Sequence, residues 1–288
     1  MEKNKQSYNC QLITNCKRHA LALLAGAAVL TGAANAAVVL DDTFGDGALG
    51  TNPGTGGGFV LQTNGLGTGA SVSESDSLAK IVDGSGNNTA GIRSSNTFDL
   101  SDNSLSYTAT WEVASLDFAT AGNVERAIFT LQTNDSWLFA GGAEESRLIV
   151  EINAQSDEAY IRYQNRSGGS NVNYTTADFA LGAFSGDADG FTATMSFDST
   201  GISFTTIGLD ATNQANISTT WAALGTFGGF ATVTGDGGFH MSAFVQDLST
   251  TGATMDLDRL SLTSIPEASS VGLIIGLVSV LAVARRRR

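Results

Sequence analysis

Carboxylates are the residues of this chain that could most readily do chemistry, and one row of alternate positions stands out. Glu151 is followed by Asn153 and Gln155, and alternate residues of a β-strand lie on the same face of a sheet. Two carboxyl groups about 5 Å apart on such a face can act as nucleophile and acid at a glycosidic bond. The second and third positions here are amides, which neither ionise nor deliver a proton. The row therefore does not predict catalysis.

The spacing nevertheless resembles the Glu-x-Asp-x-Glu signature of jelly-roll glucanases. Because Asn153 and Gln155 replace two acids, we interpret Glu151 as a chance match on a strand or as the trace of a relative that only binds.

No other group replaces the missing acids. His240 is the only histidine after His19, and its neighbours Phe239 and Met241 should point the other way on a strand. We expect a partly exposed, structural histidine. With one histidine and no Gly-x-Ser-x-Gly sequence, neither a Ser-His-Asp triad nor a histidine zinc site is expected.

Calcium is the ion that the acidic residues would suit best, because hard carboxylate oxygens are its usual ligands. A jelly roll could bring the two ends of the chain's central part together. The candidate ligands of a structural Ca²⁺ are then Asp41, Asp42, Asp256 and Asp258. No other cofactor is indicated.

Aromatic residues could stack on sugar rings where they are exposed. Trp137 and Trp221 lie near predicted turns and are the candidate glycan contacts. Trp111 lies among alternating apolar positions, so we expect it in the core.

The charge of the central part is strongly negative. Residues 37–265 hold 26 acidic and 7 basic residues, a formal charge of −19. Such a surface repels nucleic acid and anionic lipid headgroups, whereas sugars remain suitable partners. Both cysteines, Cys10 and Cys16, precede this part, so its core must be held by apolar packing.

Strand signals dominate the roughly 229 residues of this part, a length compatible with one large all-β domain. Residues 105–113 and 191–197 alternate apolar and polar side chains, which predicts strands with one wet face. Further predicted strands cover residues 127–132, 147–153, 159–163, 202–207, 239–245 and 257–263. Many such strands with turns between them predict a two-sheet sandwich or jelly roll.

Two segments resemble the first and last strands of concanavalin A-like, laminin-G-type jelly rolls. They are residues 38–44 (VVLDDTF) and 255–262 (MDLDRLSL). The resemblance implies a jelly-roll body over residues 37–263, with its first and last strands close together in one sheet.

The amino end has the three parts of a secretory signal peptide. Lys3, Lys5, Lys17 and Arg18 are followed by the apolar residues 20–30 and by an Ala-x-Ala site at Ala34 and Ala36. We expect residues 1–36 to be a signal-peptide helix that engages Sec-type export machinery and signal peptidase.

The carboxyl end reads as a membrane anchor. From Ala268 to Ala284 are 17 uncharged residues, the lower limit for a transmembrane helix. Its aliphatic residues are Val271, Leu273, Ile274, Ile275, Leu277, Val278, Val280, Leu281 and Val283. The arginines that follow, Arg285, Arg286, Arg287 and Arg288, should stay on the cytoplasmic side.

With Pro266, Glu267 and Ala268 in front of it, this end resembles the PEP-CTERM sorting tail of exported Gram-negative bacterial proteins. Ala268 stands where the commonest form of the motif has a second proline. The resemblance implies that residues 264–288 are recognised by exosortase and cut near Pro266. The body would be held at the inner membrane until then and afterwards lie at the cell surface or outside the cell. A plain single-pass anchor is the alternative.

Together these features predict an exported, non-catalytic cell-surface or matrix protein. One alternative is a carbohydrate-binding module associated with exopolysaccharide. The other is a polysaccharide hydrolase or lyase whose active site the motifs do not reveal. No nucleic-acid partner is expected.

Overall fold

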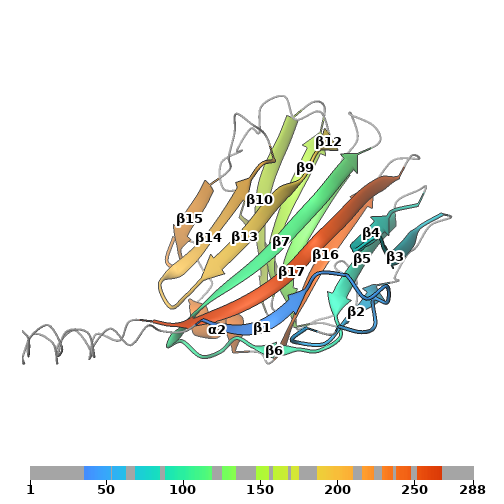
Figure 1. The fold of residues 1–288 in the computed structure, drawn as a ribbon. Coiled ribbons are helices and arrows are strands. Elements are labelled where there is room, and N and C mark those ends of the chain that lie inside the picture. Colours follow the sequence, from blue (N-terminus) through green and yellow to red (C-terminus); the bar gives the residue numbers. More distant parts are fainter. Residues whose placement is uncertain are drawn as a thin grey trace, which may run out of the picture. The chain divides into compact units, whose positions relative to one another are not determined.

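The computed structural model describes residues 36–52, 54–62, 69–84, 88–118, 125–133, 147–155, 158–167, 170–174, 187–209, 216–223, 229–235, 238–247 and 252–267. Residues Ala37–Ser264 form a compact unit. In it, two β-sheets pack face to face (Figure 1). This arrangement confirms the predicted all-β, two-sheet sandwich.

Sheet A holds nine of the described strands. Its order is β15 (Asn216–Thr220), β14 (Gly201–Ile207), β13 (Phe191–Phe197), β7 (Leu105–Phe118), β17 (Ala253–Pro266), β4 (Leu78–Val82) and β3 (Ser71–Ser75), with β1 (Ala37–Asp42) paired to β17 and β12 (Asp187–Ala188) to β7.

Sheet B holds eight of the described strands. Its order is β11 (Ser170–Tyr174), β10 (Glu158–Ser167), β9 (Arg147–Gln155), β8 (Glu125–Gln132), β16 (Gly238–Asp247), β5 (Asn88–Ser94) and β2 (Phe59–Gln62), with β6 (Phe98–Asp99) paired to β16. A single turn of helix, α2 (Phe230–Thr234), packs Phe230 against Tyr107 and Phe197.

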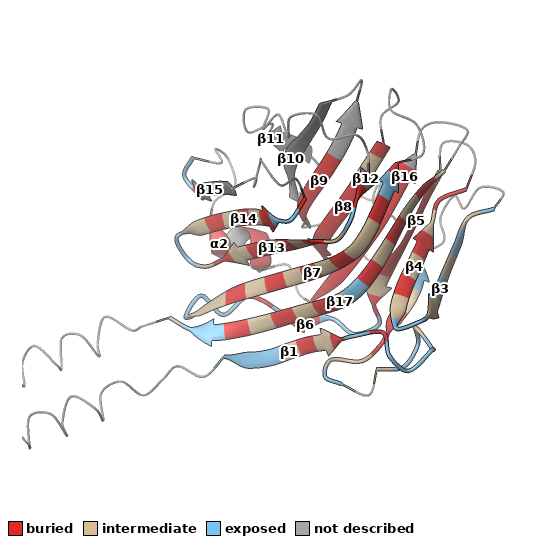
Figure 2. Cartoon of the chain, turned by 45° about the horizontal axis from the view of Figure 1, so that its top comes forward, coloured by how far each residue is buried: buried red, intermediate tan, exposed pale blue. Residues whose placement is uncertain are grey.

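The outer faces of the two sheets differ in how far they are buried. Along β7 and β17 buried residues alternate with half-buried ones (Figure 2), because one face of each strand packs on the core and the other meets solvent. Strand β8 is instead buried at nearly every position, on both faces. The outer face of sheet B is therefore shielded, although the outer face of sheet A is not.

Trp111 connects the two sheets at their centre. It has no exposed surface, and its indole Nε1–H on β7 donates to the backbone oxygen of Ser242 on β16 at 3.1 Å. Its ring also packs on that of Phe129 with centroids 5.5 Å apart. The expected core position of Trp111 is confirmed.

The first and last strands of the unit lie side by side, as the resemblance implies. Strand β1 pairs antiparallel with β17 from Ala37 opposite Ser264 to Asp42 opposite Leu260. The alternation of β17 is interrupted at Asp258 and Arg259, two consecutive residues that are not buried. At this point β17 changes partner from β4 to β1.

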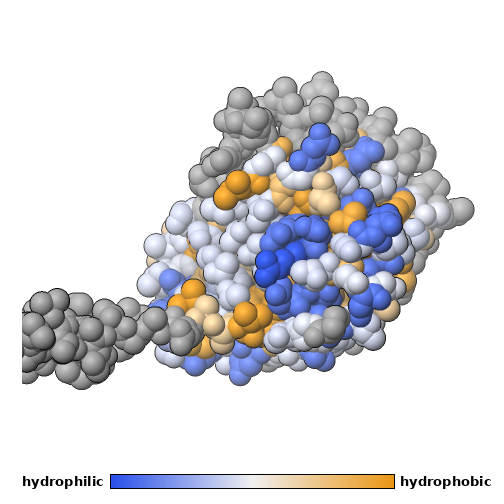
Figure 3. Space-filling view, in the orientation of Figure 1, coloured by the Kyte–Doolittle hydropathy of each residue, from blue (hydrophilic) through white to orange (hydrophobic). Residues whose placement is uncertain are grey.

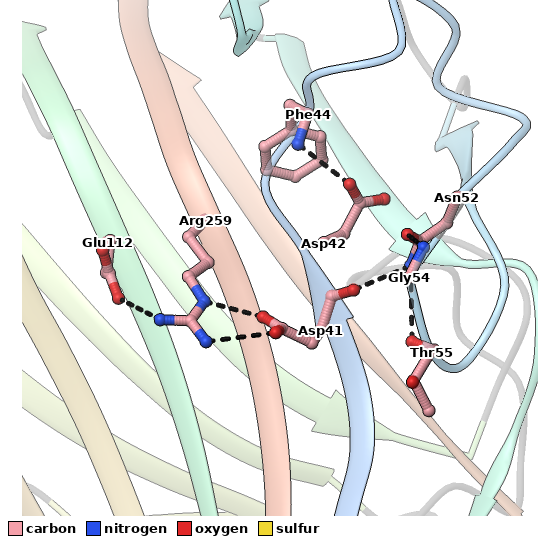
Figure 4. A network of polar contacts seen from close by, with 8 residues as sticks. All are labelled: Asp41, Asp42, Phe44, Asn52, Gly54, Thr55, Glu112 and Arg259. Carbon is pink, nitrogen blue, oxygen red and sulfur yellow. Dashed lines mark hydrogen bonds and ion pairs between the residues drawn. The ribbon is translucent and has the colours of Figure 1, made fainter.

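Arg259 uses that interruption to reach two neighbouring strands (Figure 4). Its guanidinium donates to both carboxylate oxygens of Asp41, at 2.6 and 3.1 Å, and to Glu112 at 3.3 Å. The three side chains are 32–40% exposed, so the ion pairs stabilise the fold by under about 1 kcal/mol. Their contribution is to align β1, β17 and β7.

Both predicted terminal segments lie mostly outside the described residues. In the described part of the chain, no helix is long and apolar enough to cross a membrane. The anchor predicted over residues 268–284 and the signal peptide predicted over residues 1–36 are not among the described positions, Ala36 excepted. Pro266 ends β17 and is exposed, and Glu267 is half-buried.

Candidate functional site

The outer face of sheet B is the part of the unit with the most unusual chemistry. Met241, Ala243 and Val245 of β16 lie in the core, so the residues between them face away from sheet A. The register across β5, β16, β8 and β9 then defines the face. Its polar members are Arg93, Arg126, Thr130, Gln132, Glu151, His240, Ser242 and Gln246, and its apolar members are Ile128, Ile149 and Phe244.

Two hydroxyls lie at the centre of this face. Thr130 and Ser242 are directly opposite each other on β8 and β16, and neither has exposed surface. Neither Thr130 Oγ1 nor Ser242 Oγ has a hydrogen-bond partner among the described residues. The side-chain oxygen of Gln246 on the same strand is in the same state. Each such buried group costs about 1–3 kcal/mol, so these groups lower the stability of the fold.

An arginine borders the hydroxyls on β5. Arg93 is opposite Ser242, and its Nη1 lies 3.4 Å from the Ser94 oxygen and 3.3 Å from the ring of His240. His240 itself is only 5% exposed, and its Nδ1–H donates to the Ser94 oxygen at 2.7 Å. The expectation of a partly exposed histidine is therefore wrong, although Phe239 does point into the core as expected.

A second arginine lies farther along the face. Arg126 Nη1 is 3.8 Å from Glu151 Oε1, with 17% of the arginine side chain exposed and none of the glutamate. This distance makes an ion pair but is too long for a hydrogen bond. The Nε atoms of Arg93 and Arg126 have no hydrogen-bond partner among the described residues. Both Nε atoms are themselves buried.

An apolar cluster lies among these polar side chains. Ile128, Ile149 and Phe244 form a small cluster of their own, apart from the main core. Gly91 makes room for it, because a Cβ at position 91 would lie 1.9 Å from a ring atom of Phe244. Polar and apolar side chains are therefore mixed on this face, since Ile149 is opposite Thr130 and Glu151 is opposite Ile128.

A depression lies on the outer face of sheet A. It has a volume of about 570 Å³ and is lined mainly by serine and threonine hydroxyls from β7, β13, β14 and β15. Figure 3 shows this side of the molecule, where pale, weakly polar residues cover those strands. Its threonines and serines keep contact with solvent or with one another, as Thr108 and Ser196 do at 3.1 Å. These hydroxyls are open to a ligand, whereas the central side chains on the outer face of sheet B have no exposed surface.

The tryptophans predicted to contact glycans do not supply a sugar platform in the described part. Trp221 is only 5% exposed, donates from Nε1 to the Asp198 oxygen at 2.8 Å, and packs edge-on against Phe230. The prediction for Trp221 is not supported, because apolar packing covers the ring. Trp137 lies outside the described residues.

Three of the four aspartates proposed as calcium ligands have other partners. Asp41 is held by the cation Arg259. Asp42 is buried, accepts a hydrogen bond from the Phe44 N–H at 2.9 Å, and has its pKa raised by that burial. Asp256 accepts from the Ser115 hydroxyl. Among the described residues no three His, Cys, Asp or Glu side chains form a metal-binding group. These contacts do not fit a calcium site.

Sequence patterns did not predict the face on sheet B, although they singled out Glu151 and His240. Thr130 and Ser242 alternate with core residues, which is also the pattern of an ordinary solvated strand face.

Comparisons with known proteins bear on the fold. The sequence matches no protein-family model and no curated protein. Among solved structures, the CBM2 module of the evolved Dit of Lactobacillus casei BL23 phage J-1 aligns at a TM-score of 0.55 and 11% identity, over 81% of this chain and 98% of that one.

Two plant proteins align similarly. Arcelin-5, a lectin-like defence protein of Phaseolus vulgaris, gives a TM-score of 0.51 and 12% identity over 80% of this chain and 98% of that one. Lectin II of Ulex europaeus gives 0.50 and 10% over 80% and 100%. These likenesses show that the described unit has the lectin-like, concanavalin A-like jelly-roll fold.

Proposed function

We propose that the Ala37–Ser264 unit binds carbohydrate in the depression on the outer face of sheet A. The observation that carries this proposal is its volume of about 570 Å³ and its lining of serine and threonine hydroxyls that meet solvent. Sugars present hydroxyls at the ring edge and C–H groups on the ring face. The hydroxyls of the depression can exchange hydrogen bonds with the ring-edge hydroxyls. The fold that the unit shares with lectins and a CBM2 module supports the same conclusion.

Binding without catalysis is the form of this function that we propose. Among the described residues that line the depression, Asp198 is the one acid. Its Oδ1 accepts from the backbone N–H groups of Thr200 and Gly201 and from the Thr200 hydroxyl. Glycoside hydrolysis uses two carboxyl groups about 5 to 9.5 Å apart, and the described lining of the depression supplies one.

Removing two hydroxyls from the depression is the direct test of carbohydrate binding. Thr108→Val and Ser196→Ala together should change the thermal midpoint little, because both side chains are only half-buried. They should weaken binding at least about tenfold, because the sugar loses two partners. Affinity electrophoresis of the full chain against a panel of soluble polysaccharides, in a detergent without a sugar headgroup, measures this.

The matched control removes one hydroxyl that lies outside the depression on one of the same strands. Thr194→Val on β13, whose side chain is half-buried on the outer face of sheet A but does not line the depression, should not change the mobility shift. Unchanged binding by the double variant would place the glycan elsewhere. The absence of binding to every polysaccharide in the panel would refute the proposed function.

Export and sorting make up the second part of the proposal. The signal-peptide pattern ending at Ala36 and the PEP-CTERM-like tail from residue 264 support passage through Sec-type machinery, signal peptidase and exosortase. The exposure of Pro266 also supports it, since a protease needs access to its site. Intact-mass analysis of protein recovered from its host should give a chain that begins at Ala37 and ends near Pro266. A cytosolic chain with both ends retained would contradict the proposal.

A further inference from the structure

Four hydroxyl side chains form a continuous row across sheet A. Thr108, Ser196, Ser203 and Ser218 are directly opposite one another on β7, β13, β14 and β15. Residues that are opposite on neighbouring strands share a face of the sheet, and all four line the depression. Ser218 is exposed and the other three are half-buried. With strands about 4.8 Å apart, the row is about 14 Å long.

The surroundings of the row carry little charge, although residues 37–265 have a formal charge of −19. Among the described residues that line the depression there is no basic residue, and Asp198 is the one acid. The next row along the same strands consists of Thr110, Thr194 and Thr205. The first charge beyond it on β7 is Glu112, which is paired with Arg259. An anionic ligand would therefore be repelled by the unit and would meet no cation of the described lining.

The described lining of the depression offers no open aromatic face to a sugar ring. Tyr107 and Phe197 belong to it, but each is only 2% exposed, and their rings stack with centroids 5.3 Å apart. Hydrogen bonds must then supply most of the affinity, and each changes a dissociation constant only about two- to tenfold. One sugar ring reaches only part of a row about 14 Å long. A polymer gains more, because its consecutive units bind together.

We infer that the ligand of this depression is an uncharged polysaccharide that lies along the row, across the strands, and is held through several consecutive sugar units. The inference rests on the proposed function and names its ligand class. Each hydroxyl of the row can donate one hydrogen bond and accept others, so it can match a sugar hydroxyl in either role. A carboxylate can only accept hydrogen bonds, and it brings a charge that the described lining does not balance.

The first experiment compares polymers with single sugars. The full chain, in a non-ionic detergent without a sugar headgroup, is titrated with the neutral polymers dextran, laminarin and galactomannan, with the acidic polymer polygalacturonate, and with glucose, galactose and mannose. At least one neutral polymer should bind, at least about tenfold more tightly per sugar unit than any monosaccharide. Polygalacturonate should bind at least about tenfold more weakly than that polymer. Neutral binding should change less than about twofold between about 0.05 M and about 0.5 M salt, because no charges are paired.

The second experiment removes hydroxyls of the row one at a time. Thr108→Val, Ser203→Ala and Ser218→Ala should each weaken binding of the neutral polymer about two- to tenfold, and the triple variant should weaken it more than any of them. The loss is shared because several sugar units are held. Thr254→Val is the control, since it removes a half-buried hydroxyl from β17 of the same sheet, outside the depression, and should leave binding unchanged. The thermal midpoint of each variant shows whether it folds.

The outcomes separate this inference from the proposed function. If no sugar of the set binds, or if the triple variant binds as the wild type does, carbohydrate binding in the depression is refuted. Equal binding of polygalacturonate, weakened by the triple substitution, would overturn the uncharged ligand and leave carbohydrate binding standing. A monosaccharide that binds as tightly per sugar unit would overturn the polymer, and so would a loss caused by one substitution alone. If a variant fails to fold, the wild-type preferences for neutral over acidic polymer and for polymer over single sugar still decide the question.

Discussion

Replacing Trp111 by alanine is expected to lower the free energy of unfolding by about 3–5 kcal/mol, the range for removing a large buried aromatic side chain. The ring has no exposed surface and packs on Phe129. Its loss also leaves the Ser242 oxygen without the indole donor. Because a domain is stable by only about 5–15 kcal/mol, this change removes a large share. Urea unfolding followed by near-ultraviolet circular dichroism measures it.

Trp111→Phe provides the control, because it keeps an aromatic ring but not the hydrogen bond to Ser242. Its cost should be about 1–3 kcal/mol, the penalty for an unsatisfied buried acceptor. A cost below about 1 kcal/mol for the alanine variant would mean that Trp111 does not connect the two sheets as described.

Sequence patterns located strands with one wet face and also residues 127–132 and 239–245 of β8 and β16, which are buried on both faces. In β7 and β13 every second residue is buried, and this difference in burial makes the alternation visible in the sequence. Strands β2 and β3 were not predicted, because each lies at the end of its sheet. An end strand has a neighbour on one side only, so its burial, and with it the alternation, is weak, as the half-buried residues of β3 illustrate.

The candidate site was less accessible to sequence patterns, because it depends on register. Thr108 and Ser196 are adjacent across two strands that are far apart in the chain. No local pattern places them together, and the same holds for Arg93 and Ser242 on the buried face of sheet B. On that face, Glu151 was singled out beforehand by its resemblance to a catalytic signature, and His240 as a structural histidine.

The second large effect concerns Glu151, whose carboxylate lies beside Ile128 and has no exposed surface. Replacing it by leucine should lower the free energy of unfolding by about 3 kcal/mol, because the charge of Arg126 loses its partner in a shielded place. This is the lower end of the range for a broken buried ion pair, since 17% of the Arg126 side chain meets solvent. Urea unfolding again measures the change.

The double variant Glu151→Leu with Arg126→Leu tests whether the lost stability comes from the broken ion pair. Apolar replacement of both partners is often neutral or stabilising, so the double variant should recover most of the lost stability. A catalytic carboxylate would behave differently, because replacing a residue kept for activity commonly stabilises an enzyme. The sign of the change in the single variant thus distinguishes a structural Glu151 from a catalytic one. A more stable Glu151→Leu chain would revive the hydrolase interpretation.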